Sequence, residues 1–224
     1  MKNQVELGLV LSSSHPSGTG SFAYEGSFKI VIQNLAFQKQ VSVWVQVGPV
    51  WKDILASYSH SLPENNEVWI APASNSEGEF VAKYTVNGTT YWDNNGGMNY
   101  KFPQAFDEFA VLSGKNFPVV LGNASLFSNN LHINLGIQNL DFAKVVGIVF
   151  TPDNWITVQT AFAHWDHNMP SGLEVWTVDV PVGSATQIQF AAFYRVHGNE
   201  FWDNNFSSNY KVTPTSPQQW GGVA

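Results

Sequence analysis

Cysteine is absent from the 224 residues of this chain. Its absence excludes disulfide bonds, thiolate nucleophiles and every metal cluster that requires cysteine. Long hydrophobic runs are also missing, since no apolar stretch approaches the roughly 18 residues that a membrane-spanning helix needs. The stretch from Met1 to Leu11 has one lysine and is interrupted by Glu6 and Gly8, which makes it a poor signal peptide. Two interpretations of the location stay open: a cytosolic protein, or an excised module of a secreted one.

Charged residues are scarce, and the basic ones are outnumbered. They make up 12% of the chain, and 10 Lys and Arg against 17 Asp and Glu give a formal net charge of −7. Nucleic acids and anionic membranes attract proteins through basic groups that release counterions. We therefore expect no nucleic-acid partner and no membrane partner. Apolar residues reach 44%, which is enough for a folded core and unlike a disordered composition.

Helical periodicity with capping residues is nearly absent, whereas apolar and polar residues alternate in many segments. The alternating segments are residues 28–33, 41–46, 80–86, 131–137 and 188–196. A period of two is typical of strands with one buried face. Asn87-Gly88 and Gly198-Asn199 each stand between such a segment and an aromatic run, where a tight hairpin turn is expected. The pattern predicts an all-β fold.

The sequence repeats itself once. Gln33-Asn34-Leu35-Ala36-Phe37 matches Gln138-Asn139-Leu140-Asp141-Phe142 at an offset of 105 residues. Trp92-Asp93-Asn94-Asn95 matches Trp202-Asp203-Asn204-Asn205 at an offset of 110 residues. Trp51 pairs with Trp155 and Trp69 with Trp176 between these anchors, in the same order. The repeat predicts a duplicated domain of about 100 residues, the size of a seven- or eight-strand sandwich.

The repeat also predicts the domain organisation. Copy one covers residues 1–102 and copy two covers residues 116–212. Residues 103–115 between them are too apolar for a flexible spacer, so we expect this linker to pack and the two copies to dock. Residues 213–224 contain prolines and glycines, and we expect a loosely ordered tail.

The sharpest motif is Trp-Asp-Asn-Asn-x-x-x-Asn-Tyr, present once in each copy. Sugar rings have apolar C–H faces and hydroxyl edges, so a sugar site needs aromatic platforms with amides and carboxylates beside them. The chain has 9 Trp, 7 Tyr and 16 Phe, many of them in Asn-rich surroundings. The alternative is an Asn/Asp turn that only closes a hairpin. Both copies keep the motif residues while the three between them differ, which favours a sugar site.

These residues, taken together, resemble tandem starch-binding modules of carbohydrate-binding module family 21 and its close relatives. The resemblance rests on Asn-Leu-x-Phe-x-Lys-x-Val, a following tryptophan, Glu-Val-Trp at residues 67–69 and 174–176, and the terminal Asp-Asn-Asn-x-x-x-Asn-Tyr. It implies two tandem immunoglobulin-like antiparallel β-sandwiches. It also implies non-catalytic binding of α-1,4-glucans such as starch, glycogen and maltooligosaccharides, without a cofactor. Two similar domains would add avidity.

The resemblance implies a main site in each copy, built from tryptophans and the Asn/Asp motif. Its residues are Trp51, Trp92, Asp93, Asn94, Asn95 and Asn99 in copy one, and Trp155, Trp202, Asp203, Asn204, Asn205 and Asn209 in copy two. The sequence departs from the family where a third outward aromatic is expected, because Val81 and Ala191 stand there. Trp44 has no aromatic counterpart at Val149, and its role stays open.

The resemblance also implies a second site in each copy. Its residues are Asn34, Phe37, Lys39, Tyr58 and Glu67 in copy one, and Asn139, Phe142, Lys144, Phe162 and Glu174 in copy two. An aromatic usual before the glutamate is replaced by Asn66 and Leu173. Core packing is an equal alternative for Phe37 and Phe142. Trp69 and Trp176 are mid-strand residues that we expect in the cores.

Other functions are weighed against glucan binding. His164-Trp165-Asp166-His167 has metal-ligand chemistry, but copy one offers only His60 nearby, so we expect no metal site. A small glycoside hydrolase would need a pair of carboxylates about 5–9 Å apart. A lectin for a β-glucan or a glycoprotein sugar is the main alternative. An adaptor that tethers a partner protein to glycogen is not expected, because the sequence shows no flanking basic docking segment for such a partner. A catalytic domain in a longer parent protein stays an open alternative.

Overall fold

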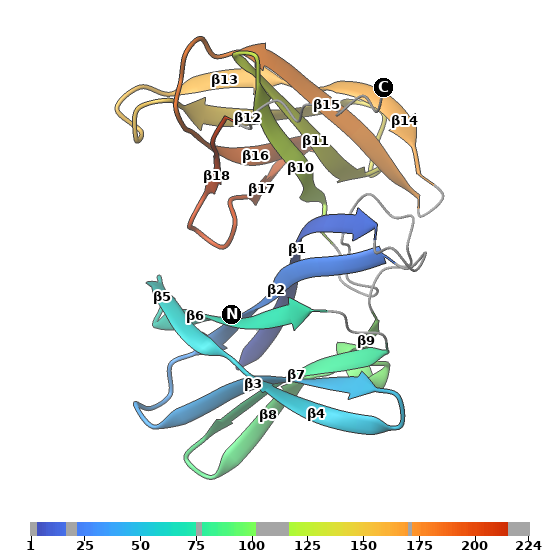
Figure 1. The fold of residues 1–224 in the computed structure, drawn as a ribbon, viewed down its shortest axis with the longest axis vertical. Helices are drawn as coiled ribbons and strands as arrows, with labels where there is room; N and C mark the ends of the chain where they lie inside the picture. The colour runs from blue at the N-terminus through green and yellow to red at the C-terminus, as the bar shows by residue number, and fades with distance from the viewer. Residues whose placement is uncertain (1–3, 17–21, 75–77, 102–116, 170–171, 215–224) are drawn as a thin grey trace, which may run out of the picture. The chain divides into compact units, whose positions relative to one another are not determined.

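The structure is a computed structural model that describes residues 4–16, 22–74, 78–101, 117–169 and 172–214 (Figure 1). The chain divides into two compact units, Met1–Asn116 and Phe117–Ala224. We call them unit one, which holds copy one, and unit two, which holds copy two. The expected linker, residues 103–115, lies outside the described residues, as do residues 215–224 of the expected tail.

Unit one consists of two antiparallel sheets. One sheet has the order β1-β2-β6-β5; the other has the order β4-β3-β7-β8, with β9 pairing with β7. The strands are β1 (Val5–Pro16), β2 (Phe22–Gln33), β3 (Lys39–Val47), β4 (Val50–Leu55), β5 (Ser57–Leu62), β6 (Asn66–Ser74), β7 (Glu79–Val86), β8 (Thr89–Asp93) and β9 (Tyr100–Lys101), with the 3-10 turn η1 (Asn95–Gly97) before β9.

Unit two repeats this topology. Its sheets have the orders β10-β11-β15-β14 and β13-β12-β16-β17, with β18 pairing with β16. The strands are β10 (Val119–Phe127), β11 (Asn130–Gln138), β12 (Lys144–Thr151), β13 (Gln159–Phe162), β14 (His164–Asn168), β15 (Leu173–Pro181), β16 (Ile188–Val196), β17 (Asn199–Asp203) and β18 (Tyr210–Val212). The prediction of an all-β fold with two tandem β-sandwiches is confirmed.

Each core lies between the two sheets of its unit, where the alternating apolar side chains meet. In unit two, Ile133 and Leu135 of β11 pack in one cluster with Ile148 of β12 and Phe190 of β16, all fully buried. The intervening residues of these strands point away from the core, because successive side chains of a strand alternate between its faces. The outward-facing residues of β3, β7, β12 and β16 therefore form the outer faces on which the candidate sites lie.

The two central hairpins have tight turns with left-handed residues. Asn87 and Gly88 connect β7 to β8 with φ of 51° and 74°, as the sequence predicts. In unit two the turn lies one residue earlier than predicted: His197 and Gly198 have φ of 52° and 73°, and Asn199 already begins β17. Two-residue hairpin turns of this kind need positive φ at both positions, and histidine supplies it here in place of asparagine.

No helix in the described part of the chain is long and apolar enough to cross a membrane.

Candidate functional site

Three tryptophans gather on the outer face of unit one. Trp44 lies on the central strand β3, Trp51 on β4 and Trp92 on β8. The ring centroid of Trp44 lies 6.3 Å from that of Trp51 and 5.3 Å from that of Trp92. Trp51 and Trp92 are 37% and 43% exposed. The structure thus brings together the two predicted tryptophans and adds Trp44, whose role the sequence left open.

A lysine and an aspartate accompany these rings. Lys83 of β7 lies with its Nζ 5.1 Å from the ring centroid of Trp44 and 5.8 Å from that of Trp92. The same Nζ contacts Asp53 Oδ2 at 3.0 Å. Burial acts to raise the pKa of Asp53, but hydrogen bonds, including the one from Lys83, and the positive charge of Lys83 hold it below its usual value. The pair adds hydrogen-bonding groups beside an aromatic surface.

The aspartate of the Asn/Asp motif anchors the motif to the sandwich. Asp93 Oδ2 accepts a hydrogen bond from Leu7 N at 2.7 Å, and its Oδ1 accepts one from Tyr100 Oη at 2.6 Å. Asp203 makes the same contacts with Leu121 N and Tyr210 Oη, both at 2.8 Å. Burial, together with the neighbouring aspartate, raises the pKa of both tyrosines far above the usual value. This carboxylate is therefore committed to the fold in both units.

The asparagines of the motif divide into turn residues and candidate ligand contacts. Asn95 Nδ2 donates to Asn99 O at 3.1 Å, and Asn205 Nδ2 donates to Asn209 O at 2.9 Å. These four residues all have φ near 55°, a left-handed conformation that asparagine tolerates well. Their backbone geometry explains why both copies keep asparagine there.

Asn94 and Asn204 retain polar groups for another partner. Each Oδ1 accepts a backbone N–H within the turn, from Gly97 at 3.1 Å and from Ser207 at 2.9 Å. Neither Nδ2 has an acceptor among the residues that the structure describes. Each of these asparagines follows two residues after a predicted platform tryptophan. These groups are thus the donors of the motif best placed for a ligand.

Unit two builds its outer face from different aromatics. Phe162, Gly147, Phe193 and Trp202 face each other across β13, β12, β16 and β17. The ring of Phe193 lies 5.7 Å from that of Trp202 and 6.3 Å from that of Phe162. Phe193 is fully buried, whereas Trp202 and Phe162 are 44% and 65% exposed. Phe193 therefore supports the exposed rings from below.

The ring of Phe193 occupies the space above Gly147. A Cβ at Gly147 would lie 2.4 Å from Ala161 O and 2.8 Å from Phe193 Cζ. We expect Gly147→Ser, which installs the residue found at the equivalent Ser42, to destabilise unit two by about 1–3 kcal/mol through overpacking. Urea denaturation measures this loss. The reverse change, Ser42→Gly, is the control, with an expected cost of about 0.5–1 kcal/mol from strand glycine; equal losses in both variants would contradict the prediction.

Trp155 is held in the long turn between β12 and β13 rather than on a strand. Its φ is 68°, and its Nε1 donates to Gln189 Oε1 at 3.0 Å. Asp153 stabilises the turn by accepting hydrogen bonds from Thr157 N at 2.9 Å and Thr151 Oγ1 at 2.7 Å. Trp155 is less exposed than its counterpart Trp51. The two units thus present this predicted platform differently.

The turn of Trp155 is expected to respond to acid. The hydrogen bond from the Thr157 amide, followed by those from the Thr151 and Thr157 hydroxyls, holds the pKa of Asp153 below its usual value of 3.8. A lowered pKa in the folded state means that the stabilisation is complete above pH 3.8 and is lost as the pH falls through the lowered value. We expect the NMR shift of the Thr157 amide to titrate with a midpoint below 3.8. A titration that persists in Asp153→Asn would contradict this assignment.

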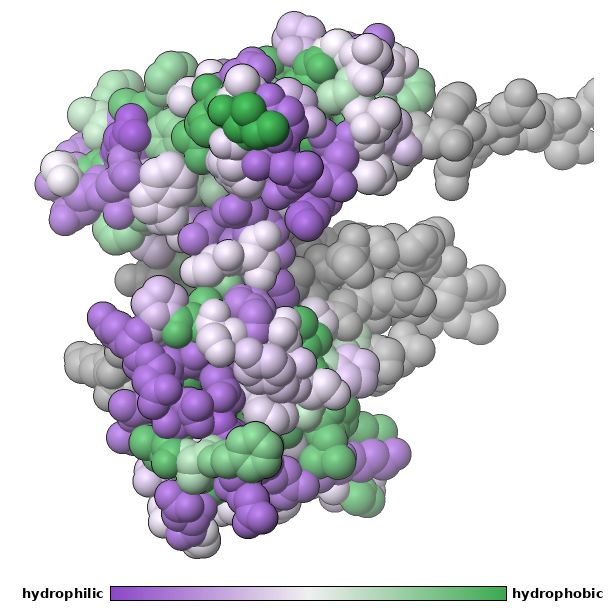
Figure 2. All heavy atoms as spheres, turned by 90° about the vertical axis from the view of Figure 1, so that its left-hand side faces the viewer, coloured by the Kyte–Doolittle hydropathy of each residue, from purple (hydrophilic) through white to green (hydrophobic). Residues whose placement is uncertain are grey.

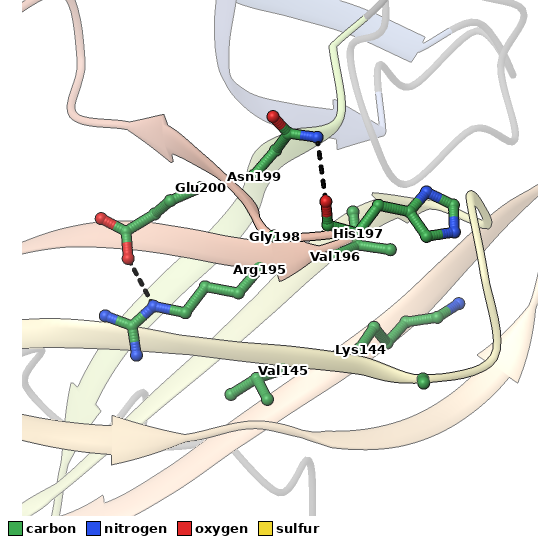
Figure 3. A pocket seen from close by; sticks show the side chains of 9 residues that line it. Lys144, Val145, Arg195, Val196, His197, Gly198, Asn199 and Glu200 are labelled. Atoms are coloured by element: carbon green, nitrogen blue, oxygen red, sulfur yellow. Dashed lines mark hydrogen bonds and ion pairs between the residues drawn. The ribbon is translucent and has the colours of Figure 1, made fainter.

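A shallow groove of about 550 Å³ adjoins the outer face of unit two (Figure 3). It runs from the start of β12 to the β16–β17 turn, and Figure 3 shows Arg195 paired with Glu200 at one end. Glu200 Oε1 also accepts a hydrogen bond from Trp202 Nε1 at 2.7 Å. His197 pairs with Asp141 at 2.6 Å and Lys144 with Glu174 at 2.8 Å. Each basic side chain of the groove thus has an acidic partner, which suits a neutral hydroxylated ligand better than a polyanion.

The pattern of the sequence in both units matches a known family. Residues 23–103 and 114–213 each match the model of the carbohydrate/starch-binding module (family 21). The chain belongs to this family. It therefore contains two family 21 modules in tandem, as the sequence resemblance predicts.

The relatives of the chain include larger proteins. Glucoamylase 1 from Rhizopus oryzae is 38% identical over 107 residues, which are 42% of this chain and 18% of that protein. Protein phosphatase 1 regulatory subunit 3C from Bos taurus is 30% identical over 121 residues, 50% of this chain and 37% of that protein. The chain thus spans well under half the length of these relatives.

A solved starch-binding domain shows a similar sequence. It is that of Rhizopus oryzae glucoamylase in complex with β-cyclodextrin and maltoheptaose, and it is 32% identical to this chain. The alignment covers 46% of this chain and 95% of that domain, with a TM-score of 0.34.

Each family 21 module of this chain contains the same buried polar network. Lys39 Nζ contacts Asn34 Oδ1 at 2.5 Å and both carboxylate oxygens of Glu67 at 2.9 Å, and Trp69 Nε1 donates to Glu67 Oε2 at 2.9 Å. In unit two the corresponding residues are Asn139, Lys144, Glu174 and Trp176, with distances of 2.7–2.8 Å. The lysine side chains are only 5% and 3% exposed. Three predicted second-site residues in each module thus satisfy one another, and both tryptophans are partly buried.

The aromatic residues of the predicted second site are exposed. Phe37 and Phe142 are each 97% exposed, which excludes the core-packing alternative for both. Tyr58 is 53% exposed, with its ring 6.0 Å from that of Trp69. Rings exposed to this extent are accessible to a ligand. Exposed apolar residues form separate patches among polar ones in Figure 2.

In unit two, the residue structurally equivalent to Tyr58 is Trp165 and not Phe162. Tyr58 faces Trp69 on the neighbouring strand, and Trp165 faces Trp176 in the same way. Phe162 instead lies on β13, opposite Gly147 and in line with Trp202. The repeat spacing pairs Tyr58 with Phe162, but the β12–β13 connection of unit two is longer than the β3–β4 connection of unit one and shifts the strands that follow it. Among the described residues, no group that could hold a metal ion includes His164, Asp166 or His167.

Proposed function

We propose that this chain is a non-catalytic binding protein for α-1,4-linked glucans such as starch, glycogen and maltooligosaccharides. The observation that carries the proposal is the pair of exposed indoles, Trp92 and Trp202, beside the Nδ2 groups of Asn94 and Asn204, which have no acceptor among the described residues. An exposed ring can stack on the apolar face of a glucose residue while the amide donates to a hydroxyl. By analogy with aromatic pairs, each stacked glucose contributes about 1 kcal/mol.

The roles of the predicted main-site residues follow from their contacts. Trp51 and Trp92 of unit one, and Trp155 and Trp202 of unit two, are the platforms. Asn94 and Asn204 are the polar contacts. Asp93, Asn95, Asp203 and Asn205 shape the turn that carries them, and Asn99 and Asn209 hold its far end. The motif therefore serves the hairpin and the ligand together.

We also propose the second site, with a revised set of residues. Phe37 with Tyr58 in unit one, and Phe142 with Trp165 in unit two, supply exposed rings. The buried networks of Lys39 and Lys144 stiffen the loops beside Phe37 and Phe142. Asn34, Glu67, Asn139 and Glu174 act within these networks. Phe162 belongs to the outer face with Trp202.

The acids present in both units do not favour hydrolysis. A glycosidase needs two carboxyl groups that can exchange protons at the reacting bond. Asp93 and Asp203 accept structural hydrogen bonds, and Glu67 and Glu174 are paired with buried lysines. The chain fits a binding module that brings a catalytic or regulatory part of a longer protein to a polysaccharide, as its glucoamylase and phosphatase-subunit relatives suggest.

Calorimetric titration with β-cyclodextrin and with a laminarin oligosaccharide tests the proposal. We expect β-cyclodextrin to bind and the β-linked oligosaccharide not to bind. The variant with both Trp92→Ala and Trp202→Ala is the matched control, and it should lose most of the cyclodextrin affinity. Binding of laminarin alone would make the chain a lectin for β-glucans. Release of reducing sugar from starch by the purified chain would revive the hydrolase alternative.

A further inference from the structure

The outer faces of the two units are not equivalent, and Trp44 marks the difference. In unit one, three indoles lie on β4, β3 and β8 of one sheet, and the ring centroid of Trp44 on β3 lies within 6.3 Å of both others. In unit two, Val149 occupies the place of Trp44, and its strand neighbours are Ala191 and Thr160. Unit two therefore has no aromatic side chain at the position of Trp44, and the aromatic of its central strand β16, Phe193, is fully buried beneath Trp202 and Phe162.

The position of Trp44 is not explained by the core. Its neighbours Val43 and Val45 point inward and are fully buried, so Trp44 points to the opposite face of β3. It is partly exposed there, and a smaller residue fills the same position in unit two without loss of the sandwich. A large aromatic on an outer face, surrounded by two other exposed indoles, indicates a surface that a ligand covers.

The cross-strand register places Trp44 opposite a side chain that cannot stack on a sugar. Trp44 lies directly opposite Val81 of β7 and beside Lys83, whose Nζ lies 5.1 Å from its ring centroid. The side chains of directly opposed residues are close enough to fill one another's space. Trp44 thus places an indole over the part of the face where β7 has only a valine.

We propose that Trp44 is a third sugar-contacting ring of unit one, and that it makes unit one the tighter binding site for curved α-glucans. The inference rests on the proposed function and specifies its ligand geometry. The plane of Trp44 is tilted by 35° from Trp51 and by 70° from Trp92. Three rings inclined to one another form a bent platform, which matches a helical or cyclic α-glucan and not a flat ribbon of β-linked glucose.

The experiment uses the full chain with the main site of unit two disabled by Trp155→Ala and Trp202→Ala. In this background we expect Trp44→Val, which installs the residue of unit two, to weaken β-cyclodextrin binding by about tenfold. The double change Trp44→Val with Val81→Trp moves the indole to the facing strand, and it should recover part of the affinity. Thermal denaturation checks that unit one stays folded in each variant.

A second measurement separates ligand contact from support of the neighbouring rings. In the unaltered chain labelled with ¹⁵N, the indole N–H signal of Trp44, assigned through Trp44→Phe, should shift on saturation with β-cyclodextrin. An unmoved Trp44 signal, or a Trp44→Val affinity within twofold of the background while Trp92→Ala weakens binding about tenfold or more, would overturn the inference and leave the proposed function intact. If the unaltered chain does not bind β-cyclodextrin at all, that result would instead refute the proposed function.

Discussion

Glu174→Gln is expected to destabilise unit two by about 3–5 kcal/mol, because it leaves the ammonium group of Lys144 buried without its counter-charge. The lysine side chain is 3% exposed and that of Glu174 is 11% exposed. The same change weakens the acceptor of Trp176 Nε1, which lies 2.8 Å from Glu174 Oε2. Urea denaturation followed by tryptophan fluorescence measures the loss, with unit one as the internal reference.

The control for this prediction removes both charges. Lys144→Met combined with Glu174→Gln leaves no unpaired ion, so we expect it to cost clearly less than Glu174→Gln alone. Glu67→Gln is the matched change in unit one and should destabilise that unit to a similar extent, since its network has the same contacts. If Glu174→Gln unfolds at the same urea concentration as the unaltered chain, the network contributes little to stability.

The second large effect concerns binding of long polysaccharide. Two modules on one chain convert the second binding event into an intramolecular one, which raises avidity by about 10²-fold or more. We therefore expect either Trp92→Ala or Trp202→Ala alone to reduce affinity for amylose by at least about 10²-fold. For β-cyclodextrin, each single change should remove one binding event and leave the other unit's affinity unchanged.

Calorimetry with both ligands distinguishes avidity from local damage. The control is Phe127→Ala, which removes an exposed ring at the end of β10 that belongs to neither proposed site. It should affect amylose binding less than Trp202→Ala does. If a single platform change lowers amylose and β-cyclodextrin affinity by the same factor, the two units act independently and the avidity argument is wrong.

Much of the fold could be predicted because its determinants are local. Alternation of residues such as Phe28, Ile30 and Ile32 reflects one strand face that packs in the core, where all three side chains are fully buried. Because the sequence is duplicated, each element occurs twice, and the hairpins and the Asn/Asp motif can be recognised in both copies. The turn of unit two was misplaced by one residue because His197, which does not usually signal a turn, adopts positive φ.

The candidate site was less predictable because it depends on register between strands. Trp44 and Val81 are far apart in sequence, and only strand pairing shows that they face each other. Phe162 was assigned to the wrong place because a longer turn shifts the strand after Trp155. The anchoring of Asp93 by Leu7 N spans 86 residues, and no local pattern indicates it.

The anchoring of Asp93 also bears on where the first module can be cut. The family match begins at residue 23, but β1 ends at Pro16 and pairs with β2 along its length. A fragment that starts at residue 23 would expose the backbone edge of β2 and remove the donor that Leu7 supplies to Asp93. In unit two the match begins at residue 114 and includes β10, which supplies the equivalent donor Leu121. The boundary of evolutionary similarity thus leaves out the first strand of the first module and includes the corresponding strand of the second.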